Sequence, residues 1–285
     1  MTIVYQAYGL QDVMRQTIFS VVSLISKTQD DMSLKVVIYT DQPEVFTGYF
    51  QGRKNILFEK VSMDQIRKWR GAIDFVHRVK IEILKDAGKK YPGPLFYADG
   101  DTYYLSSPLD LFSKVNNRTS LMHIAENSLA GGKDPISKKM NRFVKKNSFK
   151  IDGEEIRLGS QTVMWNAGAI GVSEENKNLF SKILQLTDEM HSRYPKHVTE
   201  QLSVSYFLQT TTAILPADKV IYHYWNQKLE YQTAIDQFLG QNKDLTSALK
   251  AIGAFVFPPP PKPKEKMIKK IIRKFTSKAA QEKTK

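Results

Sequence analysis

The chain of 285 residues is long enough to bury the core of one large domain or two small ones, and its 41% hydrophobic and 11% aromatic residues are typical of a folded protein. No cysteine occurs, which excludes disulfides and thiolate metal sites and leaves carboxylate, imidazole and phosphate chemistry. The net charge is +13, but residues 262–285 alone contain ten Lys or Arg and two Glu with one aromatic residue, so nucleic acid is not the expected partner.

Predicted strands and helices alternate along the first half of the chain. Strands are predicted at 3–8, 34–39 and 55–59, and helices around the apolar positions of 13–25 and of 73–84. An apolar run then leads into residue 99, and the second half adds a predicted strand at 165–172 and a capped helix at 198–208. This order predicts an α/β protein with a mostly parallel open sheet and helices on both faces.

Asp99-Gly100-Asp101 stands at the end of the apolar run and is the strongest indication of function. In an extended segment alternate side chains share a face, so both carboxylates can converge on one divalent cation, while Gly100 lets backbone come close to a ligand. Oxygen ligands of this kind suit Mn²⁺ or Mg²⁺. The alternative is a surface turn, in which Asp and Gly are also favoured.

The ends of two further strands support a ligand site at this edge. Ala7-Tyr8 ends one predicted strand and Thr40-Asp41 follows another, and open α/β sheets bind ligands outside the carboxyl ends of their strands. The chain contains neither the glycine-rich dinucleotide motif nor a P-loop. A diphosphate here would therefore be held by a metal and by cationic side chains.

Polar residues in the second half are candidates for the same site. Asn166 offers a donor and an acceptor, Ala167 and Gly168 let a ligand approach the backbone, and Glu200 with Gln201 falls in a first helical turn. Close packing of the glycine and a favourable helix-dipole position for Glu200 explain the same pattern without function.

Two more candidates and one insertion complete the pattern. His223 is a candidate third metal ligand or a packed core histidine, and Lys228 is a candidate phosphate contact. Residues 127–150, with two adjacent glycines and then a basic stretch, are either a lid or acceptor-binding loop or a plain solvated helix.

In this order the motifs resemble those of the GT-A glycosyltransferases, in particular the family-8-like retaining branch that includes glycogenin and bacterial lipooligosaccharide galactosyltransferases. The resemblance covers roughly residues 2 to 230 and implies a GT-A (Rossmann-like) fold. It rests on Ala7-Tyr8, Arg78 and Lys80, Ala98 with Asp99-Gly100-Asp101, Asn166-Ala167-Gly168, Glu200-Gln201, and His223 with Lys228. In that family the first three groups of positions hold the nucleotide base, the donor sugar with the diphosphate, and Mn²⁺. The fourth and fifth groups hold the sugar hydroxyls, and the last group holds the metal with the phosphate.

The resemblance implies an enzyme that transfers a sugar from a nucleotide-diphosphate donor, UDP-linked by expectation, to a glycan or glycolipid in cell-envelope or polysaccharide synthesis. With retention, the departing phosphate oxygen can take the acceptor's proton, whereas inversion would require Glu200 or Glu126 as a base. The alternatives are a sugar-nucleotide nucleotidyltransferase and a catalytically silent protein that binds membrane surfaces.

The C-terminal region predicts a separate segment. Residues 1–257 are expected to form the transferase domain, 258–263 a proline-rich linker, and 264–285 a basic amphipathic tail helix. Such a helix is typical of an anchor to an anionic membrane surface, although a solvated tail fits the same composition. The first residues lack the features of a signal peptide, and no uncharged apolar run of about 18 residues occurs. We therefore expect a cytoplasmic protein, peripheral on the inner face of the plasma membrane.

Overall fold

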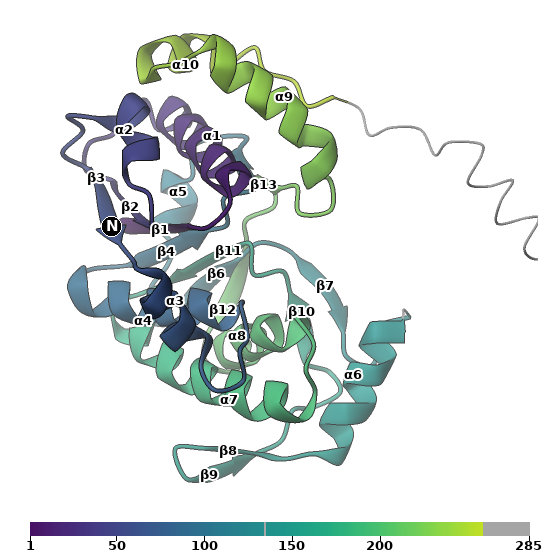
Figure 1. Ribbon diagram of the computed structural model, residues 1–285. Helices are drawn as coiled ribbons and strands as arrows, with labels where there is room; N and C mark the ends of the chain where they lie inside the picture. Colours follow the sequence, from purple (N-terminus) through teal and green to yellow (C-terminus); the bar gives the residue numbers. More distant parts are fainter. Residues whose placement is uncertain (134, 259–285) are drawn as a thin grey trace, which may run out of the picture.

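A seven-stranded sheet runs through the centre of the computed structural model, which describes residues 1–133 and 135–258 (Figure 1). Its order is β12-β6-β11-β4-β1-β2-β3. The bounds are β1 Thr2–Ala7, β2 Lys35–Thr40, β3 Ile56–Lys60, β4 Leu95–Ala98, β6 Thr119–Met122, β11 Ala169–Val172 and β12 Ala213–Pro216. β1, β2, β3 and β4 are parallel, whereas β11 runs antiparallel to both β4 and β6. The α/β class and the mostly parallel sheet are confirmed, and β11 makes the sheet mixed.

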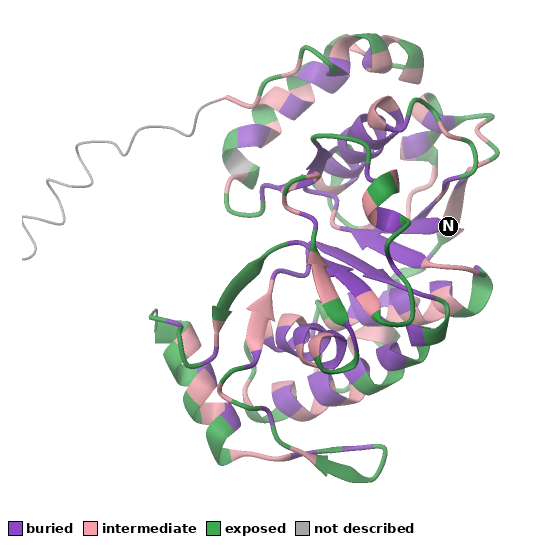
Figure 2. Cartoon of the chain, turned by 180° about the vertical axis from the view of Figure 1, so that it is seen from behind, coloured by how far each residue is buried: buried purple, intermediate pink, exposed green. Residues whose placement is uncertain are grey.

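Both faces of the central strands are buried, which explains their nearly continuous apolar sequence. In β1, Ile3 and Tyr5 belong to the core that contains α1, whereas Val4 belongs to the core on the opposite face. All three are fully buried. Figure 2 shows this burial in purple along the central strands, with exposed residues on the outer surfaces of the helices. The sheet therefore separates two hydrophobic cores and fixes the edge at which its strands end.

Helices cover both faces, as expected (Figure 1). α1, α2, α9 and α10 pack on one face, and α4, α7 and α8 on the other. The helices are α1 Gln11–Lys27, α2 Glu44–Phe50, α3 Met63–Arg70, α4 Arg78–Lys90, α5 Leu109–Phe112, α6 Pro135–Lys146, α7 Leu179–Arg193, α8 Val198–Thr211, α9 Lys228–Gln241 and α10 Leu245–Ile252, with a 3₁₀ turn at Glu175–Asn178. The alternation along the chain thus produces the layered arrangement that it predicts.

Three short strand pairs lie outside the main sheet. β7 Ala125–Ser128 pairs with β10 Val163–Trp165, β5 Thr102–Tyr104 with β13 Ile221–His223, and β8 Phe149–Ile151 with β9 Glu154–Ile156. The β5–β13 pair is functionally important, because it places His223 opposite Thr102 and so beside the residues that follow β4.

The structure corrects two of the predicted boundaries. The helix expected over 73–84 begins only at Arg78, because Gly71 and Asp74 adopt positive φ angles of 68° and 47° and turn the chain between α3 and α4. The strand expected over 165–172 is interrupted between β10 and β11. The interruption comprises Asn166, Ala167 and Gly168, and it allows these residues to leave the sheet and enter the site described below.

The segment that follows β13, with α9 and α10, packs against α1. Phe257 packs against a group of aromatic rings, 4.5 Å from the ring of Tyr231 and 5.3 Å from that of Tyr224. The linker 258–263, apart from Pro258, and the tail 264–285 lie outside the described residues, so the domain boundaries stay predictions. Among the helices that the structure describes, none has the length and apolar character needed to cross a membrane.

Candidate active site

Asp99 and Asp101 follow β4 directly and are held in place by local hydrogen bonds. The Tyr97 hydroxyl donates to Asp99 Oδ1 at 2.6 Å, and the Thr102 hydroxyl donates to the Asp99 carbonyl at 2.7 Å. Asp101 is 3% exposed, so its carboxylate needs compensating charge. Gly100 packs against α1, where a Cβ would lie 2.5 Å from Thr17 Oγ1. Its missing side chain therefore makes room for a helix and not for a ligand.

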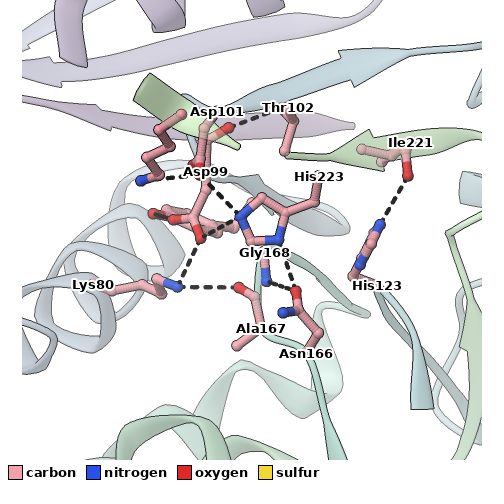
Figure 3. Close-up of polar contacts among 12 residues, drawn as sticks. Lys80, Asp99, Asp101, Thr102, His123, Asn166, Ala167, Gly168, Ile221 and His223 are labelled. Atoms are coloured by element: carbon pink, nitrogen blue, oxygen red, sulfur yellow. Dashed lines mark hydrogen bonds and ion pairs between the residues drawn. The ribbon is translucent and has the colours of Figure 1, made fainter. Parts of the chain in front are cut away.

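The irregular segment between β10 and β11 positions His223. Asn166 Oδ1 accepts a hydrogen bond from the Gly168 amide at 2.9 Å and lies 2.8 Å from His223 Nδ1 (Figure 3). Because this oxygen is an acceptor, Nδ1 carries a proton, and Nε2 is the nitrogen that faces the two aspartates. His223 Nε2 lies 3.3 Å from Asp101 Oδ2 and 3.7 Å from Asp99 Oδ2.

The resulting cluster fits a divalent cation. One ligand atom from each of Asp99, Asp101 and His223 lies within 4.8 Å of the others, and two oxygens with one imidazole nitrogen are donors that Mn²⁺ accepts. Gly168 leaves space for the imidazole, because a Cβ there would lie 2.0 Å from His223 Nδ1. Burial raises the pKa of Asp101, but the hydrogen bonds and charges of His223 and Lys228 outweigh it and hold this pKa below its usual range. Asp101 is therefore ionised and ready to bind a cation.

Lys80 links the metal cluster to Glu200 in the first turn of α8. The Lys80 ammonium lies 3.3 Å from Asp99 Oδ2 and 3.7 Å from Glu200 Oε1, and it donates to the Ala167 carbonyl at 3.1 Å. Burial lowers the pKa of Lys80, but Asp99 and Glu200 reverse this shift and raise it. Burial also raises the pKa of Glu200 to about 7, although Lys80 opposes the shift. The site thus contains a fixed cation beside a carboxyl group that titrates near neutrality.

One cavity of about 380 Å³ joins ten of the residues singled out in the sequence. They are Lys80, Asp99, Asp101, Asn166, Ala167, Gly168, Glu200, Gln201, His223 and Lys228, and Glu126 lines the cavity beside them. The Gln201 amide donates to Glu126 at 3.1 Å, and the exposed Lys228 ammonium lies 2.9 Å from Asp101. Segments separated by more than a hundred positions therefore meet in a single polar cleft.

Five of the predicted residues are outside the lining of this cavity: Ala7, Tyr8, Arg78, Ala98 and Gly100. Ala7 and Ala98 are fully buried at the ends of β1 and β4. Arg78 points to α7, where its guanidinium lies 2.8 Å from Asp188, and it donates to the Trp69 carbonyl at 2.6 Å. As placed here, Arg78 joins helices and does not face the metal cluster.

The cavity also contains three residues that the sequence analysis missed as candidates. His77 and His197 are the residues before α4 and α8, and their ring centroids lie 6.5 Å apart. Trp225, 56% exposed, lies between β13 and α9 on the edge of the cavity. A signal existed for the histidines, since each precedes a helix whose first turn carries a predicted site residue.

The fold is similar to that of solved glycosyltransferases. A galactosyltransferase, LgtC, in complex with donor and acceptor sugar analogs superposes with a TM-score of 0.52 at 13% identity, covering 76% of this chain and 74% of that one. The apo form of mouse xyloside xylosyltransferase 1 superposes with a TM-score of 0.50 at 11% identity, covering 83% of this chain and 93% of that one. The chain has the GT-A fold. No protein-family model matches the sequence, and no curated protein matches it either.

Proposed function

We propose that this protein is a metal-dependent glycosyltransferase that uses a nucleotide-diphosphate sugar, UDP-linked, and a glycan or glycolipid acceptor. The observation that carries the proposal is the joining of Asp99, Asp101 and His223 at the end of β4, inside a polar cavity on a GT-A fold. Its setting would be cell-envelope or polysaccharide synthesis, within the family-8-like retaining branch that the motif order resembles.

The chain's own residues would bind the donor by charge. Asp99, Asp101 and His223 would hold Mn²⁺ or Mg²⁺, and the bound ion would supply Lewis-acid stabilisation of the diphosphate leaving group. Lys80 is a buried cation beside this position, and Lys228 can turn from Asp101 to a phosphate because its side chain is 48% exposed. Fixed positive charges at the place where the leaving group gains negative charge lower the barrier without reorganisation.

Three polar residues around the cavity would act on the reacting sugar. Glu200 and Gln201 line the cavity from α8, and Asn166 lines it from the segment between β10 and β11. With retention, Glu200 stabilises the oxocarbenium-like sugar in its ionised form, and the departing phosphate oxygen accepts the proton of the acceptor hydroxyl. With inversion, Glu200 or Glu126 would take that proton instead, and a pKa of about 7 suits Glu200 to this role.

The proposal includes the predicted tail at 264–285, which lies outside the described residues. The basic and apolar positions of the tail would attach the enzyme to an anionic membrane surface, on the cytoplasmic side. Nucleic acid has no part in this proposal.

Hydrolysis of UDP-sugars by the full chain, with Mn²⁺ and with excess EDTA, tests the proposal. We expect activity only with the metal, and its loss in Asp99→Asn and Asp101→Asn, because a diphosphate in this cleft otherwise faces two carboxylates. Asp110→Asn, which removes an exposed carboxylate on α5, is the matched control. Full activity in EDTA, or in either site variant, would overturn the metal assignment.

A further inference from the structure

A second cavity of about 410 Å³ adjoins the first one; we call it the side chamber. It lies between α6 and the β7–β10 strand pair, which Figure 1 shows next to one another. The two cavities share a rim composed of Glu126, Ile136, Ser137, Val198 and Trp225. The side chamber therefore lies directly beside the first cavity.

The lining of the side chamber contains fewer charged residues than that of the metal cleft. Leu129 and Met140 are almost completely buried in its wall, and Met164 and Ile136 contribute further apolar surface. Its carboxylate, Glu126, stands on the shared rim and already accepts a hydrogen bond from Gln201. Apart from Glu126, the polar residues that line the chamber are Asn127, Ser128 and Ser137. Against the aliphatic and thioether part of the wall, a sugar ring would lose hydrogen bonds to water without replacement. An apolar group would gain from the same transfer.

The shared rim also exposes apolar side chains to water. Ile136 is 47% exposed and Trp225 is 56% exposed, and both belong to the small set of large hydrophobic residues that are exposed in the described chain. Exposed apolar side chains that gather at a cavity mouth mark a surface which a ligand covers. The flat indole of Trp225 suits the apolar face of a sugar ring at the junction of the two cavities.

We propose that the side chamber binds the apolar aglycone of the acceptor, an alkyl or similar hydrocarbon group attached directly to the sugar that receives the transferred unit. The inference rests on the proposed function and defines the acceptor as a glycolipid-like molecule and not a free glycan. α6 then acts as a wall of the acceptor site: Met140 faces the chamber, and the basic residues of the helix lie on its exposed side. The wall also explains the position of this insertion beside the cleft.

Isothermal titration calorimetry with methyl and hexyl β-D-galactopyranoside tests the proposal on the full chain. Each buried methylene raises affinity by about fourfold, so the hexyl compound gains up to roughly a thousandfold over the methyl compound. The gain should carry a negative heat-capacity change, the mark of apolar burial. Ile136→Ser and Met164→Gln should each reduce the hexyl affinity several-fold. Met164→Gln should leave the affinity for the methyl compound unchanged, because Met164 lies outside the lining of the first cavity.

Leu105→Ser is the matched control, since Leu105 is 48% exposed and lies outside both cavities. Equal affinity for the two galactosides, or a hexyl preference that survives both chamber variants, would overturn the inference. A parallel titration with UDP and Mn²⁺ separates the two proposals. If UDP binds with the metal and the hexyl gain is absent, only the acceptor inference fails. If UDP does not bind while the hexyl gain is present, the chamber is an apolar site and the proposed function fails.

Discussion

Replacement of Glu200 by glutamine should stabilise the metal-free protein, and by an amount that depends on pH. Glu200 is 3% exposed, and burial raises its pKa from 4.5 to about 7. The folded chain therefore retains a proton that the unfolded chain releases from about pH 4.5 upward. As the pH rises from the unfolded-state pKa to the folded-state pKa, the free energy of unfolding decreases. Above the folded-state pKa the decrease amounts to about 3 kcal/mol. Glutamine cannot ionise and avoids this loss.

Urea unfolding in EDTA, at about pH 4.5 and about pH 8, measures the effect. The free energy of unfolding of Glu200→Gln minus that of the unmodified chain should be greater by about 3 kcal/mol at the higher pH than at the lower pH. Lys80 remains paired in the variant, because Asp99 lies 3.3 Å from its ammonium. Glu230→Gln, at an exposed position of α9, removes the same charge without changing a buried site. A stability difference that is the same at both pH values would refute the reasoning, since it would mean that burial does not control the ionisation of Glu200.

Three further changes have defined outcomes. Gly168→Ala should weaken Mn²⁺ binding in a titration and lower the free energy of unfolding by about 1–3 kcal/mol, because the new Cβ displaces the His223 ring; Gly240→Ala, in open space on α9, should do neither. Gln201→Asn should reduce turnover more than donor affinity, and an effect on affinity alone would limit Gln201 to ground-state binding. Truncation after Phe257 should abolish the salt-sensitive binding of the protein to anionic vesicles while UDP-sugar hydrolysis continues; equal sedimentation of both forms would contradict a membrane role for the tail.

Local patterns in the sequence predict those parts of the site that depend on a single strand end. Asp99 and Asp101 follow an apolar run, and that run forms β4, whose end lies at the ligand edge of the sheet. The cluster with His223 required the order of motifs along the whole chain, because nothing local to β13 indicates which strand it pairs with. The sequence does not predict the side chamber. The position of the apolar face of α6 depends on contacts with residues that are far away in the chain.

Arg78 shows that a role assigned from the family resemblance can disagree with the direction in which the side chain points. Arg78 and Lys80 are two residues apart in α4, and positions with this spacing lie on nearly opposite sides of a helix. Lys80 faces Asp99, so Arg78 faces α7 and pairs with Asp188. In the same way, a run of apolar residues at 165–172 cannot show that β11 runs antiparallel to β4. Such features depend on tertiary contacts and not on periodicity.

The position of His223 opposite Thr102 has a consequence for how the protein acquires its site during synthesis. The two aspartates and the histidine are separated by more than 120 positions, and β13 is among the last strands to leave the ribosome. Contacts over such distances form late in folding, because the intervening chain must first lose its conformational freedom. A growing chain therefore presents a pair of carboxylates without their imidazole, and the complete ligand set arises only when the C-terminal segments have folded onto the sheet. Metal binding would then stabilise the finished fold selectively over every shorter intermediate.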